Sequence, residues 1–232
     1  MKVEIYSDVA CPWCYIGKKR FEKALAAFPQ RDAVEITYRA FQLNPDLSAD
    51  PSEARPQADY LRDRFGPGYK AMLDRVVEVA AGEGIAFNAD AALVASTFAA
   101  HRLVWFAEQE GGSSLKARMV DALFKAQFTD GGNVADPAAL LALATGVGLD
   151  AERTRAFLAS DAGASEVREE LEEGHALGIT GVPTFVFEGK WGVSGAQEAE
   201  TFLRILEQVE GEMGATVPET AAPACEDDAC AL

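Results

Sequence analysis

The sequence predicts an α/β fold in which a small sheet is interrupted by a large all-helical insertion. A strand, a helix and a second strand follow one another within residues 2–43, which is the spacing of a parallel βαβ unit. A long stretch without strand signal comes next, and a strand pair then returns after Pro183. Because strands stand on both sides of the helical block, the block is inserted into the sheet domain and not appended to it.

The first unit is predicted from short apolar patterns. Lys2–Ser7 reads as a strand and residues 18–28 as a helix with one apolar side. Residues 33–43 read as the second strand, which ends at the turn Asn44-Pro45-Asp46. Residues 50–56 are polar and contain proline, so they are the expected connection that leaves the sheet.

Glycines and capping residues divide the following hundred or so residues into helices. Gly111-Gly112 and Gly131-Gly132 are expected to end helices, whereas Asp136-Pro137 is a cap followed by a first-turn proline. The large aromatic residues of this block are expected in its core. The predicted helices are 60–65, 69–81, 91–110, 115–128, 136–145, one from Asp150, and 166–177.

Strands return near the end of the chain. The alternating apolar residues after Pro183 read as a strand, Glu188-Gly189-Lys190 as a hairpin turn, and Trp191–Ser194 as the partner strand. An amphipathic helix is predicted over 197–209. We therefore divide the chain into a sheet domain of residues 1–55 and 162–211, an inserted helical domain of residues 56–161, and an acidic flexible tail of residues 212–232.

The composition excludes two classes of partner. The 232 residues carry a formal net charge of −16, whereas nucleic acids and anionic membrane surfaces are recognised by clustered Lys and Arg. No apolar run approaches the roughly 18–20 residues of a membrane span, and the N-terminus has none of the features of a signal peptide. We therefore expect a cytoplasmic protein, where a close cysteine pair is more often catalytic or metal-binding than structural.

The motif that carries chemistry is Cys11-Pro12-Trp13-Cys14, between the first strand and the first helix. Pro12 suits the first helical position, because its missing N–H would be unpaired there. Cys11 then lies where free backbone N–H groups and the positive end of the helix dipole converge. This environment favours a thiolate, so Cys11 is the predicted nucleophile. Cys14, one turn further on, is placed to attack a mixed disulfide formed on Cys11.

Two charged residues near the motif bear on this chemistry. Asp8 would oppose thiolate formation if its carboxylate came close to the sulfur, or it could serve as a strand-end turn residue. Lys18 could offset that charge, but we expect it to be a solvated lysine. A zinc site would need four ligands, and a C-x-x-C pair in a βαβ context favours redox chemistry, so no metal is expected.

With these motifs, the sequence resembles the DsbA-like branch of the thioredoxin superfamily, and within it the FrnE-type proteins, which are related to 2-hydroxychromene-2-carboxylate isomerases and kappa glutathione transferases. The resemblance extends from residue 2 to 210. It rests on the cysteine motif, the helical insertion and Gly181-Val182-Pro183-Thr184, with further matches at residues 41–45, 100–102 and 190–197.

The resemblance implies a thioredoxin fold split by a helical domain, with Pro183 cis and packed beside the cysteine pair. It also implies that the backbone of Val182 binds an extended substrate segment, with Pro12 and Trp13 beside it. A histidine in place of Trp13 could stabilise the thiolate by its charge, and tryptophan cannot. We therefore expect a redox potential toward the reducing end of the superfamily range of about −270 to −120 mV.

The primary hypothesis is a protein disulfide oxidoreductase. Cys11 attacks a substrate disulfide, or a substrate thiol attacks the oxidised pair, and Cys14 resolves the intermediate. The expected partners are disulfide- or thiol-containing proteins or small molecules, and a second copy of the chain is a further candidate. No cofactor is expected beyond a reducing system, with glutathione a candidate electron donor or co-substrate.

Two other classes of function stay open besides this first one. A glutathione-dependent isomerase or transferase of an aromatic small molecule is the runner-up, although the resemblance implies a serine at the position of Cys11 in that branch. His101 would suit such an enzyme if it faced a pocket near Cys11, but a hydrogen-bonded core histidine is the default. A binding module, either for metal through all four thiols or for unfolded proteins, is the third class.

The tail contains a second pair, Cys225 and Cys230, in an acidic setting. Acidic neighbours disfavour thiolates, so these thiols should be slow nucleophiles. We hypothesise an auxiliary redox pair that donates electrons to the Cys11–Cys14 disulfide at high effective concentration.

Overall fold

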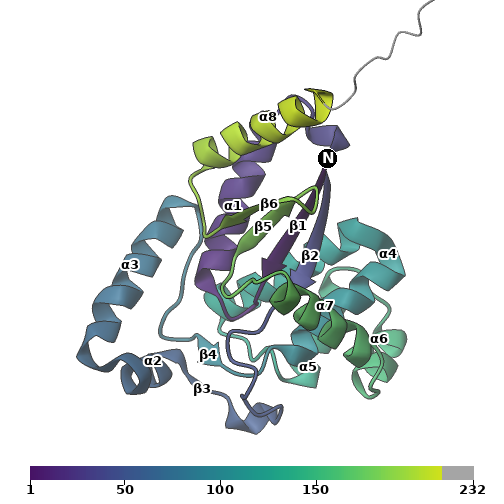
Figure 1. The fold of residues 1–232 in the computed structure, drawn as a ribbon. Coiled ribbons are helices and arrows are strands. Elements are labelled where there is room, and N and C mark those ends of the chain that lie inside the picture. The colour runs from purple at the N-terminus through teal and green to yellow at the C-terminus, as the bar shows by residue number, and fades with distance from the viewer. Residues whose placement is uncertain (216–232) are drawn as a thin grey trace, which may run out of the picture.

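The computed structural model describes residues 1–215 and centres on a four-stranded sheet. The strand order is β2-β1-β5-β6 (Figure 1). β1 pairs in parallel with β2 and antiparallel with β5, which pairs antiparallel with β6. The parallel pair predicted from the βαβ spacing is therefore confirmed. The strands are β1 (Lys2–Ser7), β2 (Glu35–Ala40), β5 (Thr184–Phe187) and β6 (Trp191–Ser194).

Helices cover both faces of this sheet. Successive side chains of β5 point to opposite faces and contact the helices on each. On one face, the Phe185 ring lies 5.3 Å from that of Phe21 in α1 and 4.5 Å from that of Phe202 in α8. On the other face, Val186 packs with Tyr6, near α7. Because successive side chains of a strand point to opposite faces, β5 contributes to an apolar layer on each face of the sheet. The covering helices are α1 (Pro12–Ala27), α7 (Ala164–Ala176) and α8 (Ala199–Ala215).

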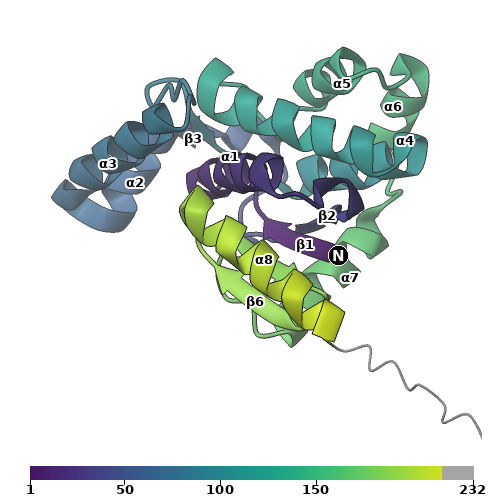
Figure 2. The same ribbon diagram turned by 90° about the horizontal axis from the view of Figure 1, so that it is seen from above.

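The chain between β2 and α7 is mainly helical and forms two groups. Figure 2 shows α2 and α3 on one side of the molecule and α4, α5 and α6 together on another. Within residues 1–215, no helix is long and apolar enough to cross a bilayer. The helices are α2 (Gln57–Phe65), α3 (Tyr69–Gly82), α4 (Phe98–Lys125), α5 (Pro137–Gly146) and α6 (Ala151–Leu158). Short elements are the 3₁₀ turns Arg31–Ala33, Pro51–Glu53 and Gly66–Gly68, the π turn Ala126–Asp130, and the strands β3 (Arg55–Pro56) and β4 (Leu93–Val94).

One apolar core continues from the sheet into the insertion. Tyr15 of α1 stacks on Phe124 of α4 with 5.1 Å between ring centroids, and Phe106 stacks on Phe157 of α6 at 4.3 Å. Of the five aromatic residues of the helical block expected in the core, Phe106, Phe124 and Phe128 are buried, and Phe98 and Trp105 are half-buried. The helix that carries the cysteine motif is thus packed directly against the insertion.

The helix break and helix starts that were predicted from neighbouring residues are confirmed. The helical backbone of α4 is interrupted at Gly111 and Gly112, and Gly112 has a φ of 68°, a conformation that glycine adopts without strain. The Asp136 carboxylate accepts a hydrogen bond from the Ala138 N–H at 3.0 Å, and Asp150 caps α6 in the same manner at 2.8 Å.

Three predicted elements have different bounds in the structure. The helix expected from residue 91 begins only at Phe98, because residues 93–94 form β4 and pair with β3. The Gln57 N–H also donates to the Ala92 carbonyl at 2.9 Å. These tertiary hydrogen bonds override the helix propensity of the alanine-rich segment and place strands in a region expected to have none. The strand expected over 33–43 is shorter, since residues 31–33 form a 3₁₀ turn. The last helix, α8, continues to Ala215, inside the segment expected to be a tail.

Candidate active site

Cys11 is the residue immediately before α1, and Pro12 is the first residue of that helix. Its backbone is extended (φ −95°, ψ 110°), and its side chain makes no capping hydrogen bond. The first-turn N–H groups of α1 are therefore not capped by this side chain. Cys11 and Cys14 are both free thiols, so the structure shows the reduced pair.

The loop that contains the cis-proline lies against the first sulfur. The Cys11 thiol donates a hydrogen bond to the Val182 carbonyl at 3.5 Å, and the Val182–Pro183 peptide bond is cis, as the resemblance implied. Among the described residues, no partner is found for the Val182 N–H. The Val182 N–H is thus available beside the sulfur, as is needed to bind the backbone of an extended segment.

Cys14 differs from Cys11 in its surroundings. Its side chain is 2% exposed, and burial raises the pKa of the Cys14 thiol well above its usual value. The adjacent Cys11 sulfur raises that pKa further, whereas hydrogen bonds from the Asp8 backbone and the Ser7 side chain lower it only in part. Cys14 therefore keeps its proton at neutral pH.

The Asp8 carboxylate is buried, and both of its oxygens have hydrogen-bond partners. It accepts hydrogen bonds from the Leu43 N–H at 2.8 Å and the Ala10 N–H at 3.3 Å, and it lies 3.2 Å from the His101 Nε2. Asp8 thereby ties the loop before the cysteine motif to the loop after β2 and to α4. His101 is a hydrogen-bonded interior residue behind the cysteine pair, and it does not line the cleft over Cys11 described below.

The expectation that Lys18 is solvated is wrong. Its side chain is 2% exposed, and its ammonium pairs with Glu22 and, at 2.8 Å, with Asp121 of α4. A buried ammonium requires charged partners, and α4 supplies one that lies far away in the sequence. Lys18 thus joins the active-site helix to the insertion.

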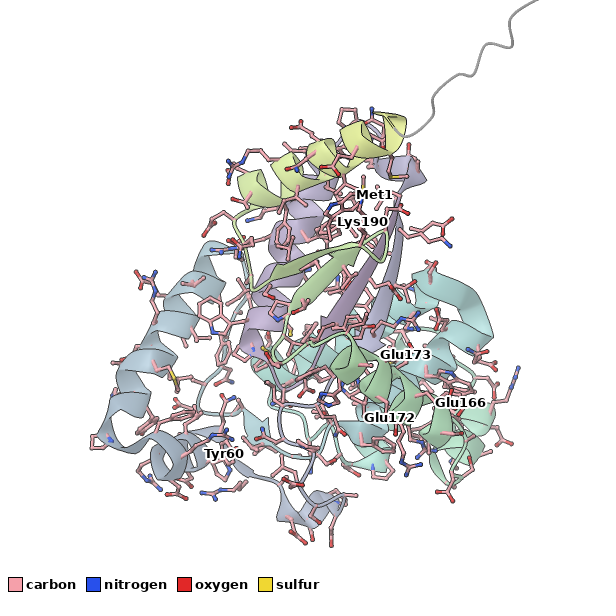
Figure 3. The ribbon with its side chains drawn as sticks, viewed as in Figure 1. Met1, Tyr60, Glu166, Glu172, Glu173 and Lys190 are labelled. Atoms are coloured by element: carbon pink, nitrogen blue, oxygen red, sulfur yellow. The ribbon has the colours of Figure 1, made fainter. Side chains whose placement is uncertain are left out.

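Cys11 opens into an apolar cleft of about 370 Å³ between the start of α1 and the α2–α3 pair. Trp13 forms part of its wall and is 37% exposed, and Tyr60 (labelled in Figure 3) contributes from α2. A cleft of this size suits a small molecule or a few residues of a peptide. The lining residues besides Cys11, Trp13 and Tyr60 are Ala10, Pro12, Leu43, Asn44, Gln57, Leu61, Arg64, Phe65, Met72, Leu73, Val76, Phe87, Leu93, Val94, Gln127 and Val182.

A second hollow, of about 520 Å³, lies on the other side of the cis-proline loop. It is lined by the loop itself and by β5 and β6, up to the turn that carries Lys190 (Figure 3). Val182 lines both hollows. An extended segment bound at Val182 would therefore have space on either side.

One carboxylate attaches the far wall of the cleft to the active-site helix. Glu83, which follows α3, is bound by Arg20 at 2.7 Å and by Lys23 at 2.5 Å, both from α1. Burial raises the pKa of Glu83, but the hydrogen bonds from these two cations outweigh that effect, so its pKa lies below its usual value. The ionised Glu83 holds the α2–α3 pair in place.

The structure brings together five of the residues predicted for the site. Cys11, Pro12, Trp13 and Val182 line the cleft, and Pro183 follows Val182 in the second hollow. Cys14 lies beneath them and lines neither hollow. Cys225 and Cys230 lie outside the described residues. Within residues 1–215, no group of three or more His, Cys, Asp or Glu side chains is arranged to hold a metal ion.

Sequence reasoning missed the residues that α2 and α3 add to the cleft. Gln57, Arg64 and Phe65 come from α2, and Met72 comes from α3. The available signal was the presence of large apolar residues on the short, otherwise polar helix α2 and on the neighbouring α3, because a single helix pair has little core to bury them in.

Comparisons with known proteins agree with this geometry. The profile of the DSBA-like thioredoxin domain matches residues 2–207. The probable DsbA oxidoreductase SCO1869 from Streptomyces coelicolor is 43% identical, and its crystal structure aligns with a TM-score of 0.86 over 100% of this chain and 99% of that one. The uncharacterized protein YwbO of Bacillus subtilis is 28% identical over 88% of this chain and 94% of its own length. A 2-hydroxychromene-2-carboxylate isomerase, 20% identical with a TM-score of 0.62 over 92% and 96% of the two chains, shares the fold.

Proposed function

Because this chain belongs to the DSBA-like thioredoxin domain family, we propose that it is a thiol–disulfide oxidoreductase in which Cys11 exchanges with the substrate and Cys14 resolves the intermediate. The observation that carries the proposal is the juxtaposition at the start of α1. Two free thiols lie at this point, and the first of them, Cys11, contacts the Val182 carbonyl and lines an apolar cleft.

In the reducing direction, the Cys11 thiolate attacks one sulfur of a substrate disulfide. The substrate S–S bond breaks, a Cys11–substrate disulfide forms, and the released substrate sulfur takes up a proton. Cys14 then loses its proton and attacks the Cys11 sulfur, which frees the second substrate thiol and leaves a Cys11–Cys14 disulfide. Two electrons pass from the enzyme to the substrate, and an external dithiol returns them. In the oxidising direction every step runs in reverse.

The unequal environments of the two sulfurs support this order of events. The raised pKa of Cys14 keeps that thiol protonated while the first exchange takes place, so it does not compete for the substrate. Both cysteines are largely buried, at 4% exposure for Cys11 and 2% for Cys14, but only Cys11 lines the cleft through which a substrate can approach. Cys14 acts only when a mixed disulfide brings an electrophilic sulfur within its reach.

The proposal is tested with a cyclic peptide disulfide as substrate and a dithiol as reductant. We expect turnover by the wild type, none by Cys11→Ser, and a Cys11–peptide adduct visible by mass spectrometry with Cys14→Ser. Equilibration of the pair against glutathione gives its potential, which we propose is nearer to that of thioredoxin than to that of DsbA because Trp13 carries no charge. Turnover retained by Cys11→Ser would contradict the mechanism.

A second candidate is a glutathione-dependent isomerase or transferase of an aromatic small molecule. The observation in its favour is the apolar cleft, whose volume is in the range of small-molecule sites. Isomerase activity that survives Cys14→Ser, in a protein without peptide-disulfide turnover, would favour this function over the first.

We also propose that the chain is of the FrnE type and works in the cytoplasm. Residues 41–45, 100–102 and 190–197 support the subgroup. The close Cys11–Cys14 pair supports the location, because in a reducing compartment such a pair is more often catalytic or metal-binding than structural. Cell fractionation tests the second proposal.

A further inference from the structure

The exposed apolar side chains of the described residues are concentrated at the cleft. Five large apolar residues are more than about a third exposed, and four of them line it. Such a concentration around a reactive sulfur is typical of a binding surface. The four residues are Trp13, Leu43, Phe65 and Met72.

Arg64 is the one charged side chain among the residues that line this cleft. Its Nη1 donates to the Asn44 Oδ1 at 2.9 Å and to the Tyr60 hydroxyl at 2.6 Å, and its guanidinium lies 5.6 Å from the centre of the Phe65 ring. All three partners are neutral. These contacts hold the guanidinium at the rim of the cleft with its charge uncompensated by any carboxylate among residues 1–215.

The two neighbouring arginines are paired with carboxylates, whereas within residues 1–215 Arg64 is not. Arg55 pairs with Asp63 at 2.5 Å, and Arg62 pairs with Asp59 at 2.8 Å. The acidic side chains of α2 are thus bound to the other two arginines, in a chain whose net charge is −16. Where carboxylates are abundant, a cation left without one at a binding cleft indicates an external anion.

A second polar residue of the cleft, Gln57, has an oxygen without a hydrogen-bond partner in the described part of the chain. Gln57 lines the cleft and is 7% exposed, and its Oε1 is buried without a hydrogen bond. A buried acceptor without a donor is unfavourable, so a bound molecule that brings an N–H would stabilise this site. A polypeptide backbone supplies such groups.

We propose that Arg64 is a specificity-determining residue that selects polypeptide substrates in which the reacting cysteine lies in an apolar segment with a carboxylate close by. The apolar residues contact the cleft wall, the carboxylate pairs with Arg64, and a backbone N–H donates to Gln57 Oε1. This inference rests on the proposed oxidoreductase function and names the substrate class of the same site.

The test uses three cyclic peptide disulfides that differ only in having Glu, Gln or Lys beside one cysteine. We expect wild-type kcat/KM to fall in the order Glu, Gln, Lys. Arg64→Met keeps the apolar stem and should abolish the ranking by raising KM for the Glu peptide about three- to tenfold, since Arg64 is at an exposed rim. The value of kcat should not change. Arg64→Lys, which keeps the charge, should retain part of the preference.

Arg62→Met is the matched control, because Arg62 lies on the same helix and does not line the cleft. It should keep the wild-type ranking. A Glu preference that persists in Arg64→Met, or equal wild-type kcat/KM for all three peptides, would overturn the role of Arg64 alone. Failure of the wild type to reduce any of the three would instead overturn the oxidoreductase function on which it rests.

Discussion

Gly17 controls how closely the active-site helix approaches the cis-proline loop. It lies on α1 one turn after Cys14 and is buried. A Cβ at this position would be 3.0 Å from the Pro183 Cγ and 3.4 Å from the Cα and Cβ of Ala196. We predict that Gly17→Ala displaces Pro183, and with it the Val182 carbonyl that accepts the hydrogen bond from Cys11.

The magnitude follows from these distances. Non-bonded carbons are most favourable at about 3.5–4.0 Å, so Pro183 or the helix must move by about 0.5 Å or more. Overpacking of this kind costs about 1–3 kcal/mol, whereas alanine gains about 1 kcal/mol over glycine in a helix. The net loss of stability should therefore be about 0–2 kcal/mol. Displacement of a substrate-binding group by about half an ångström should lower kcat/KM about tenfold, since about 1 Å costs roughly a hundredfold.

Urea unfolding and peptide-disulfide turnover measure the two effects on the same protein. Gly82→Ala is the control, because a Cβ at Gly82 in α3 meets open space, and it should leave kcat/KM unchanged. If Gly17→Ala were more stable than the wild type by the full helical increment and equally active, the contact with Pro183 would have no part in shaping the site.

Three other predictions concern titration and buried polar groups. Because the folded-state pKa of Glu83 is lowered from its ordinary value of 4.5, its stabilisation is fully present above that value and is lost as the pH falls through the lower folded-state pKa. Glu83→Gln should lower the free energy of unfolding by about 1.5–3 kcal/mol at pH 7 and by progressively less as the pH falls below 4.5, as followed by urea unfolding; a pH-independent difference would contradict this. Because the pKa of Cys14 is raised, iodoacetamide should modify Cys11 and not Cys14 of this pair in the native reduced protein at pH 7, and equal labelling of these two sites by mass spectrometry would refute that assignment. Asp8→Asn leaves one acceptor oxygen in place of two, so the midpoint of urea unfolding should correspond to a loss of about 1–3 kcal/mol; an unchanged midpoint would show that the carboxylate is dispensable.

Features set by neighbouring residues could be predicted from the sequence. The caps at Asp136 and Asp150 and the break at Gly111 depend on bonds or dihedral angles within about one turn. The same is true of Cys11 before a helix that begins with proline. The strands on both sides of the insertion belong to one sheet, which depends on residues far apart in the sequence. The family resemblance carried by a few motifs was enough to indicate it.

Features set by distant residues could not be predicted in this way. Asp8 and His101 are 93 positions apart, and nothing in either local pattern identifies the other as its partner. Lys18 was expected in solvent, where most lysines lie, whereas its burial depends on Asp121 from another element. The cleft likewise depends on contacts between α3 and α1 that are distant in the sequence, namely the pairing of Glu83 with Arg20 and the packing of Ile16 against Val76 and Ala80. In each case the energy comes from a tertiary contact that competes with many equally plausible partners.

The distance along the chain between the two halves of the site has a consequence for biosynthesis. Cys11 leaves the ribosome early, and the Val182 loop that covers it follows 171 residues later. At about 5–20 residues per second, this delay is roughly 10–30 s. During that interval the nascent chain carries Cys11 without the Val182 loop and β1 without its antiparallel partner β5, so the thiol is open to reaction until the loop packs over it.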